Sequence, residues 1–164
     1  MNRLPILRVL FPAILAATVL AGCKQESDLP RIETEIPFRA DGVVEFLRPD
    51  STLITRIVVE IARSDSARAR GLMQRRSLPA RGGMLFIDRV ADVQEFWMEN
   101  TPIPLDMIFV SADGRVLNVE RAHPFSRERI LSAGPALYNI EVRAGFAERY
   151  GVEPGVIVRV RENA

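Results

Sequence analysis

The sequence predicts a mostly β domain, built as a small sandwich, jelly roll or barrel with two short helices. From Gly42 onward, short runs rich in β-branched and aromatic residues alternate with turn residues. Only two stretches carry helix signals, and both are short. Many closely spaced strands with few helices are typical of sandwiches and barrels. The same pattern continues to the end of the chain, so we expect one β-rich domain over residues 42–164.

The strands are expected in eight runs. They cover residues 43–47, 53–62, 84–87, 93–98, 105–110, 115–120, 136–142 and 156–160. The run 53–62 is the richest in β-branched side chains, which favour strands. Asp113 and Gly114 separate the runs 105–110 and 115–120, and glycine accepts the positive φ that a tight turn requires. We therefore expect those two runs to form a hairpin.

Two short helices are expected to interrupt the strands. The segment 64–71 offers Ser64 and Asp65 as N-cap residues, whose side chains can accept hydrogen bonds from the first turn, and it ends at Gly71. The segment 144–151 ends at Gly151 in the same way. Both helices are too short to form the core alone.

The first 22 residues have the features of an export signal. Arg3 and Arg8 precede an apolar run over residues 9–20, and small residues follow it. The run is shorter than the roughly 20 residues that a membrane-spanning helix needs. Leu20-Ala21-Gly22-Cys23 resembles a lipobox, which implies that Cys23 is acylated and becomes the first residue of the mature chain. Residues 23–41 would then be the acylated cysteine and a polar tether.

Lipidation implies a location in the cell envelope. Several acyl chains at one terminus give stable anchoring, because each buried CH₂ contributes about 0.8 kcal/mol. The residue after Cys23 is Lys24 rather than the aspartate that often retains a lipoprotein at the inner membrane. We therefore expect the domain to be anchored in the outer membrane, facing the periplasm, with the lipid bilayer as its first partner.

Charge and cysteine content narrow the possible partners. Removing residues 1–22 leaves 20 basic against 21 acidic residues. Nucleic-acid binding requires a cationic excess for the phosphates, and this composition lacks it, so no nucleic-acid partner is expected. Cys23 is the one cysteine of the chain, so no intrachain disulfide can form. Stability must come from packing alone.

Three segments carry a family resemblance. They are residues 68–73 (Arg-Ala-Arg-Gly-Leu-Met), 83–86 (Gly-Met-Leu-Phe) and 96–109, which contains Trp97-Met98-Glu99-Asn100-Thr101 and then Pro104-Leu105-Asp106; residues 136–142 add a weaker fourth. Together they resemble the prokaryotic domain of unknown function 192 family over roughly residues 43–161. The resemblance implies a compact, mostly β fold of the sandwich or jelly-roll kind. It implies no established activity and no catalytic residues.

Five residues are candidates for a ligand site: Arg70, Trp97, Asn100, Thr101 and Asp106. Trp97 can stack on a sugar or another flat ligand while Asn100 hydrogen-bonds it; alternatively, Asn100 bonds its own backbone in a turn and Trp97 packs in the core. Asp106 lies in an apolar strand. If it faces inward, burial raises its pKa unless Arg70 or another cation pairs with it. Otherwise it faces outward or caps a neighbouring turn.

Copper is the metal that the residue composition makes a candidate ligand. Thioether and imidazole ligands suit Cu(I), and the mature chain offers Met73, Met84, Met98 and His123. Methionine is also a common filler of irregular cores, and no paired ligand spacing is present. One histidine and no free thiol argue against zinc. We therefore expect no cofactor.

The expected function is that of a non-enzymatic lipoprotein whose domain binds an envelope protein, a glycan or a small ligand. The reason is that an anchor and tether carry a domain without a recognisable catalytic set; no Gly-x-Ser-x-Gly elbow and no available cysteine nucleophile are present. Two alternatives stay open. One is an envelope carbohydrate-active enzyme using Asp106 with Glu99 or Glu120. The other is a methionine-rich copper-binding protein.

Overall fold

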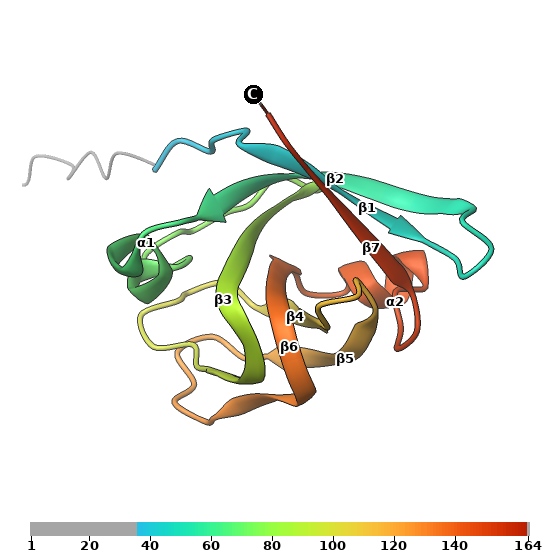
Figure 1. Ribbon diagram of the computed structural model, residues 1–164. Coiled ribbons are helices and arrows are strands. Elements are labelled where there is room, and N and C mark those ends of the chain that lie inside the picture. Colours follow the sequence, from blue (N-terminus) through green and yellow to red (C-terminus); the bar gives the residue numbers. More distant parts are fainter. Residues whose placement is uncertain (1–35, 164) are drawn as a thin grey trace, which may run out of the picture. The chain divides into compact units, whose positions relative to one another are not determined.

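A computed structural model of the protein describes residues 36–163 (Figure 1). The predicted export signal, Cys23 and residues 24–35 of the predicted tether lie outside the described residues. The elements follow in the order β1 (Gly42–Leu47), β2 (Leu53–Ala62), α1 (Asp65–Arg70), β3 (Gly82–Phe96), β4 (Leu105–Val110), β5 (Val116–Ala122), β6 (Ile130–Arg143), α2 (Phe146–Tyr150) and β7 (Ile157–Glu162). The prediction of a mostly β fold with two short helices is therefore confirmed.

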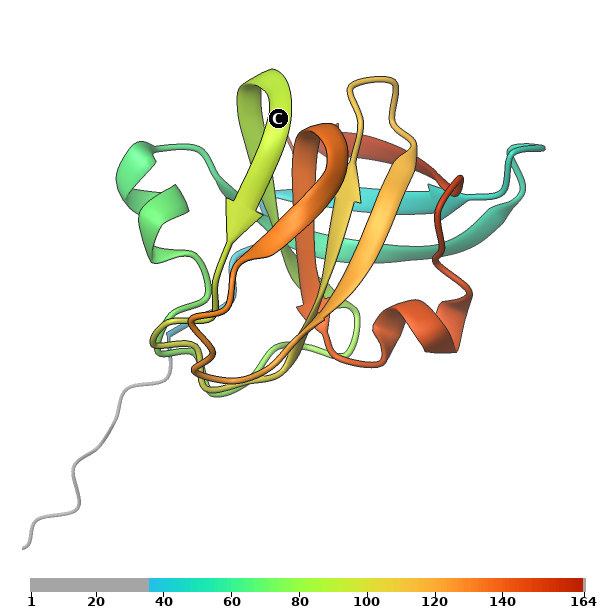
Figure 2. The ribbon, with the colours of Figure 1, turned by 90° about the horizontal axis from the view of Figure 1, so that it is seen from below.

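The strands form a single mixed sheet in the order β5-β4-β6-β3-β2-β1-β7. Neighbouring strands are antiparallel except β2 and β3, which run parallel and are joined through α1. The sheet curls into a half-barrel, with α1 and α2 at opposite sides of it (Figures 1 and 2). An antiparallel bridge between Arg115 and Ile157 links the two edge regions. The half-barrel shape is one of the architectures that the short, frequent strands allowed.

Two differences from the expected strands concern bends. The run 84–87 and residues 93–96 of the run 93–98 belong to one long strand, β3, whose pairing with β6 shifts register between Ile87 and Asp92. Trp97 and Met98 follow the strand and are not part of it. β6 begins at Ile130, six residues before the apolar run that predicted it. Both regions contain polar or glycine residues where the strand pairing is irregular. These residues interrupt the strand pattern of the sequence, so the sequence predicted shorter strands than the structure has. The β4–β5 hairpin forms as predicted, with Gly114 at φ 82°.

The two faces of the sheet pack into two hydrophobic clusters. Ile108 and Val110 of β4 point into one cluster, which α2 covers with Phe146. Met107 and Phe109 point into the other, which contains Phe86 of β3 and extends toward α1. Successive side chains of a strand lie on opposite faces, so a one-residue difference decides which cluster a side chain joins. No helix within residues 36–163 is long and apolar enough to cross a membrane.

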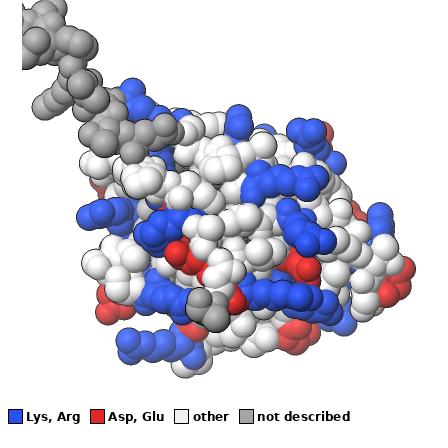
Figure 3. Space-filling model, turned by 90° about the horizontal axis from the view of Figure 1, so that it is seen from above, with Lys and Arg blue, Asp and Glu red and all other residues white. Residues whose placement is uncertain are grey.

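The outer surface over β1, β2 and β7 is rich in arginine (Figure 3). Glu45 of β1 pairs in register with Arg56 and Arg159, and its carboxylate lies 3.2 Å from Arg161 and 3.8 Å from Arg159. Both arginine side chains are more than half exposed, so solvent screens these ion pairs and they contribute little to stability. This surface is therefore a solvated, partly neutralised face.

Candidate ligand pocket between α1 and β3

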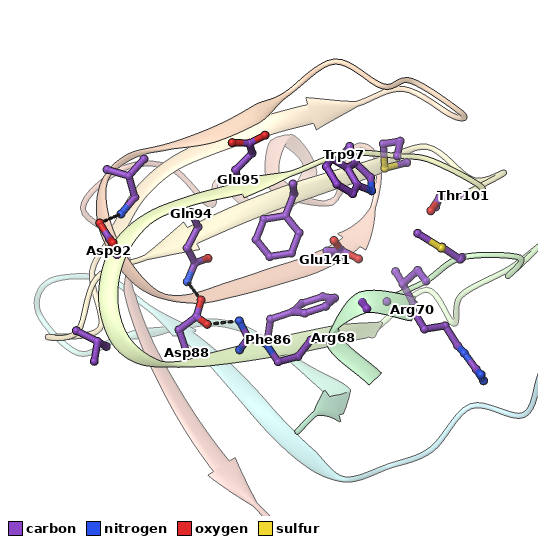
Figure 4. A pocket seen from close by; sticks show the side chains of 18 residues that line it. Arg68, Arg70, Phe86, Asp88, Asp92, Gln94, Glu95, Trp97, Thr101 and Glu141 are labelled. Atoms are coloured by element: carbon purple, nitrogen blue, oxygen red, sulfur yellow. Dashed lines mark hydrogen bonds and ion pairs between the residues drawn. The ribbon is translucent and has the colours of Figure 1, made fainter. Parts of the chain in front are cut away.

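A cavity of about 540 Å³ lies between α1 and the bent strand β3 (Figure 4). Its walls come from residues 68–73 of α1 and the following turn, from residues between Phe86 and Thr101, and from Glu141 of β6. The second hydrophobic cluster forms its floor, since Phe86, Met98 and Leu72 belong to both. The bend of β3 and the short helix together create the hollow.

The helix wall is positioned by its two ends. The Ser64 side chain accepts a hydrogen bond from the Ala67 amide at 3.1 Å, which caps the first turn. Gly71 ends the helix at φ 47°, and a Cβ there would lie 3.3 Å from the Phe86 ring. Glycine therefore allows both the positive φ and the close approach of α1 to β3.

A polar network ties α1 to β3 at the rim. Arg68 pairs with the Asp88 carboxylate and donates to the Ile87 carbonyl. Gln94 donates to the other Asp88 oxygen at 2.7 Å and to the Ala136 carbonyl at 3.1 Å. Figure 4 shows this chain of contacts running from α1 across the bend. The network holds the pocket open in one shape, which lowers the entropy cost of ordering it on binding.

The segment after β3 supplies the pocket mouth. Trp97 is 53% exposed and lines the cavity, so it is not a core residue. Asn100 has φ 57°, and its carbonyl accepts a hydrogen bond from the Gln74 amide at 2.7 Å. Asparagine tolerates this left-handed conformation better than most residues. Asn100 is thus a turn residue that holds the neighbouring loop, and Thr101 after it is buried and lines the cavity.

Glu141 is the functional candidate that the sequence reasoning did not single out. Its side chain is 4% exposed, lines the cavity, and pairs in register with Met84 of β3 and Met107 of β4. Figure 4 shows its carboxyl between Trp97 and Phe86. Burial raises the pKa of Glu141 to about 8, and the Asn139 side chain only partly opposes this rise. At neutral pH the group is therefore mostly a neutral carboxylic acid.

Asn139 adds a second buried polar group beside it. It lies two residues before Glu141 on the same face of β6 and is fully buried. Within residues 36–163 neither of its amide atoms has a hydrogen-bond partner of ordinary geometry. Buried polar groups are normally satisfied, so this amide is an exception that calls for an explanation. Asn139 and Glu141 together place two buried polar side chains on one face of β6.

The structure brings some of the five predicted site residues together and separates others. Arg70, Trp97 and Thr101 line the cavity, although Arg70 points away from Glu141 in Figure 4. Asn100 does not line it. Asp106 lies on the opposite face of the sheet, where its carboxylate accepts from the Ala147 amide of α2 at 2.9 Å and from Arg121 at 2.7 Å. Its contacts bind the sheet to α2.

The methionines gather at the pocket, but the histidine does not. Met73 and Met98 line the cavity, and Met84 and Met107 flank Glu141 on the neighbouring strands. Met84, Met98 and Met107 pack in the second hydrophobic cluster. His123 is exposed and does not line the cavity. Within the described part of the chain, no group of three or more His, Cys, Asp or Glu residues is arranged to hold a metal ion.

Comparison with known proteins places the chain in a family. The DUF192 family, described as "Uncharacterized ACR, COG1430", matches residues 46–160, and the chain belongs to it. A crystal structure of a protein of unknown function from Novosphingobium aromaticivorans DSM 12444 is similar at 37% identity and a TM-score of 0.67, with 71% of this chain and 83% of that chain covered. None of the curated proteins matches the chain.

A second solved structure is similar to this domain over nearly the whole length of that second protein. It comes from Sinorhizobium meliloti 1021 and is named there as a candidate transcription regulator. It is 34% identical, with a TM-score of 0.70, and the match covers 76% of this chain and 97% of that chain. The fold is therefore shared with proteins whose biochemical role is open.

Proposed function

We propose that this protein is a non-enzymatic binding protein whose ligand occupies the α1–β3 pocket, and that a lipid anchor at Cys23 holds it at the cell envelope. The observation that carries the proposal is a cavity of about 540 Å³ that contains a buried, unpaired carboxyl group and a half-exposed tryptophan. Ligand sites are typically concave and mostly apolar, with a few polar groups that fix orientation. The pocket is concave, and apolar residues such as Leu72, Phe86 and Met98 share its lining about equally with polar and charged residues.

The lining supports binding rather than turnover. No residue that lines this cavity, among those the structure describes, is a serine, cysteine, histidine or lysine. These four residue types are common nucleophiles and bases of covalent catalysis, so a carboxylate or Thr101 would have to take that role in this cavity. Asp88 is a possible second carboxylate beside Glu141, but Arg68 and Gln94 already engage both of its oxygens.

The proposed location and partners rest on the amino-terminal pattern of the sequence. The lipobox-like residues before Cys23 support acylation, and Lys24 favours the outer membrane. A domain on a polar tether would then face the periplasm. An envelope protein or a glycan can reach the pocket mouth there, and small molecules of the periplasm can enter it.

A second candidate function rests on Glu141. A carboxyl group with a pKa of about 8 in a pocket is suited to general acid catalysis near neutral pH. This version of the carbohydrate-enzyme hypothesis moves the acid from Asp106 to Glu141. Hydrolysis of purified peptidoglycan or its fragments by the wild-type domain, abolished in Glu141→Gln, would favour it over simple binding.

The binding proposal can be tested with probes already present in the protein. Trp97 is the one tryptophan of the chain, so its fluorescence reports on the pocket mouth. Methyl ¹³C labelling of methionine adds Met73 and Met98 as reporters inside it. We expect a panel of envelope sugars, amines, carboxylates and short peptides to contain a compound that shifts all three signals saturably.

A matched pair of variants provides the control. Ala69 is exposed on α1 and lines the pocket, whereas Ala133 is exposed on β6 and does not. Ala69→Phe should obstruct the mouth and weaken the response, and Ala133→Phe should leave it unchanged. A panel that moves none of the reporters, or a response equal in both variants, would refute a ligand site in this pocket.

A further inference from the structure

We propose that the ligand of the α1–β3 pocket is an organic ammonium ion, whose positive charge pairs with Glu141 and lies against the rings of Phe86, Phe96 and Trp97. This inference rests on the proposed binding function and names the chemical class of the ligand. It comes from three features of the pocket: an acid without a counter-charge, an aromatic lining, and an acidic charge balance in which no cation points at that acid.

The first feature is that Glu141 lacks the counter-charge that the other buried acids have. Three acidic side chains are buried among the described residues. Glu60 lies 2.6 Å from Arg75, and Asp106 lies 2.7 Å from Arg121. Glu141 forms no ion pair within residues 36–163. Because buried charges are normally paired, an acid that faces a cavity without a nearby cation is a site for a cation brought by a ligand.

The second feature is the aromatic lining. The Phe86 and Phe96 rings meet edge to face, with centroids 5.2 Å apart and an interplanar angle of 76°. Both rings and the half-exposed Trp97 line the same cavity as Glu141. The face of an aromatic ring attracts a cation, and aromatic pockets recognise quaternary ammonium groups in this way. An ammonium ion would find both a carboxylate and ring faces here.

The third feature is the charge balance of the lining. Two arginines and four acids line the cavity. Arg68 is engaged by Asp88, and Arg70 points away from Glu141 (Figure 4). The field inside the cavity therefore favours a cation over an anion, since the two positive charges do not point at the buried carboxyl.

Binding is expected to release a proton. In the free protein, the raised pKa keeps the Glu141 carboxyl protonated at neutral pH. When an ammonium ion enters, the O–H proton leaves to solvent and the carboxylate pairs with the cation. Other charged side chains lie on the elements around Glu141. They are Glu60 on β2, Arg68 and Arg70 on α1, Arg75 on the loop between α1 and β3, Asp88, Asp92 and Glu95 on β3, and Arg143 on β6. The affinity for a permanently charged ligand should rise with pH up to about 8.

The experiment compares two molecules of the same shape. Choline chloride carries a trimethylammonium group, and 3,3-dimethyl-1-butanol replaces its nitrogen by carbon. Each is titrated into the domain at fixed ionic strength, with Trp97 fluorescence and calorimetry in two buffers of different ionisation enthalpy. We expect choline to bind saturably, to release a proton at pH 7, and to bind more tightly at pH 8 than at pH 6; the neutral alcohol should bind more weakly.

Two substitutions assign the effect to Glu141. Glu141→Gln keeps the shape of the neutral acid and should fold, so it removes only the charge that can pair with choline. It should weaken choline binding roughly 30-fold or more, the loss expected for a desolvated charge pair. Glu153→Gln, at an exposed position outside the pocket, should bind like wild type.

The outcomes separate the two proposals. Equal binding of choline and the alcohol, or unchanged choline binding by Glu141→Gln, would overturn the ammonium inference and leave a pocket for neutral ligands. Absence of choline binding would also overturn it. If, in addition, none of the wider ligand panel moves the Trp97 and methionine signals, the proposed binding function fails as well.

Discussion

Replacing Glu141 by glutamine should change how the stability of this domain depends on pH. An unfolded glutamate has its ordinary pKa of 4.5, whereas burial raises the pKa of folded Glu141 to about 8. Between these values the folded state holds a proton that the unfolded state has lost. The free energy of unfolding must therefore fall as pH rises, by about 1.4 kcal/mol for each pH unit.

The total effect is large compared with the stability of a typical domain. The contribution of Glu141 is fully present below pH 4.5 and is lost progressively as pH rises to about 8. From pH 5 to pH 8 the loss sums to about 4 kcal/mol, against a total of roughly 5–15 kcal/mol for most domains. Glutamine has no proton to lose, so Glu141→Gln should be close to wild type at pH 5 and more stable at pH 8.

The assay is urea unfolding followed by circular dichroism at half-unit steps from pH 5 to pH 8.5. Carboxylates whose pKa is lowered by hydrogen bonds or ion pairs, such as Asp41 and Glu95, are ionised in both states from about pH 6 upward, so they add no slope there. Glu153→Gln, an exposed substitution, should reproduce the wild-type slope. Parallel curves for wild type and Glu141→Gln would show that the buried carboxyl is not protonated and would refute this reasoning.

Four further results are expected. Asp106→Asn should lower the free energy of unfolding by about 1–3 kcal/mol, because it weakens the contacts of Asp106 to α2 and to the half-exposed Arg121. The same substitution should leave choline binding unchanged. A loss of binding without a loss of stability would contradict the placement of Asp106. Gly71→Ala should cost about 1–3 kcal/mol in urea unfolding, because φ is 47° and the added Cβ would crowd Phe86; wild-type stability would be inconsistent with this contact. Cys23→Ala should abolish labelling by radioactive palmitate and release the protein from membranes, and continued labelling would rule out the proposed anchor. Equilibrium dialysis with Cu(I) should show no stoichiometric uptake, because most of the methionines pack in the second hydrophobic cluster and His123 lies outside the pocket. Binding of one equivalent of Cu(I) would support the copper hypothesis instead.

Local patterns in the sequence were sufficient for much of the fold. Short runs rich in β-branched and aromatic residues, separated by turn residues, predicted strands at β1, β2, β4 and β5, and Gly114 predicted the β4–β5 hairpin. Ser64 and Gly71 marked both ends of α1. These features depend on a few neighbouring residues, whose backbone preferences and capping groups act locally. The bend that joins residues 84–87 and 93–96 into β3 depends on pairing with β6, and so it was not predicted.

The candidate site was predicted only in part. Arg70, Trp97 and Thr101 do line one cavity, although they come from two separate segments of the family resemblance. Asp106 attracted attention because a charged residue stood in an apolar strand. It is indeed buried, but on the α2 face, one residue away from Met107 on the pocket side. Both faces of β4 are covered by hydrophobic clusters, so the sequence of the strand does not show which face belongs to the pocket.

Taken alone, the sequence determined the class of fold, its hairpin and its helix ends, because these follow from residue types at short range. Only the tertiary structure decided which acid is the unusual one. In residues 138–142, polar Asn139 and Glu141 alternate with apolar neighbours, the pattern of a strand with one face in water. The curl of the sheet and the position of α1 cover that face and bury Glu141 without a cation. Burial and pairing are properties of surroundings assembled from distant segments, which a local pattern cannot report.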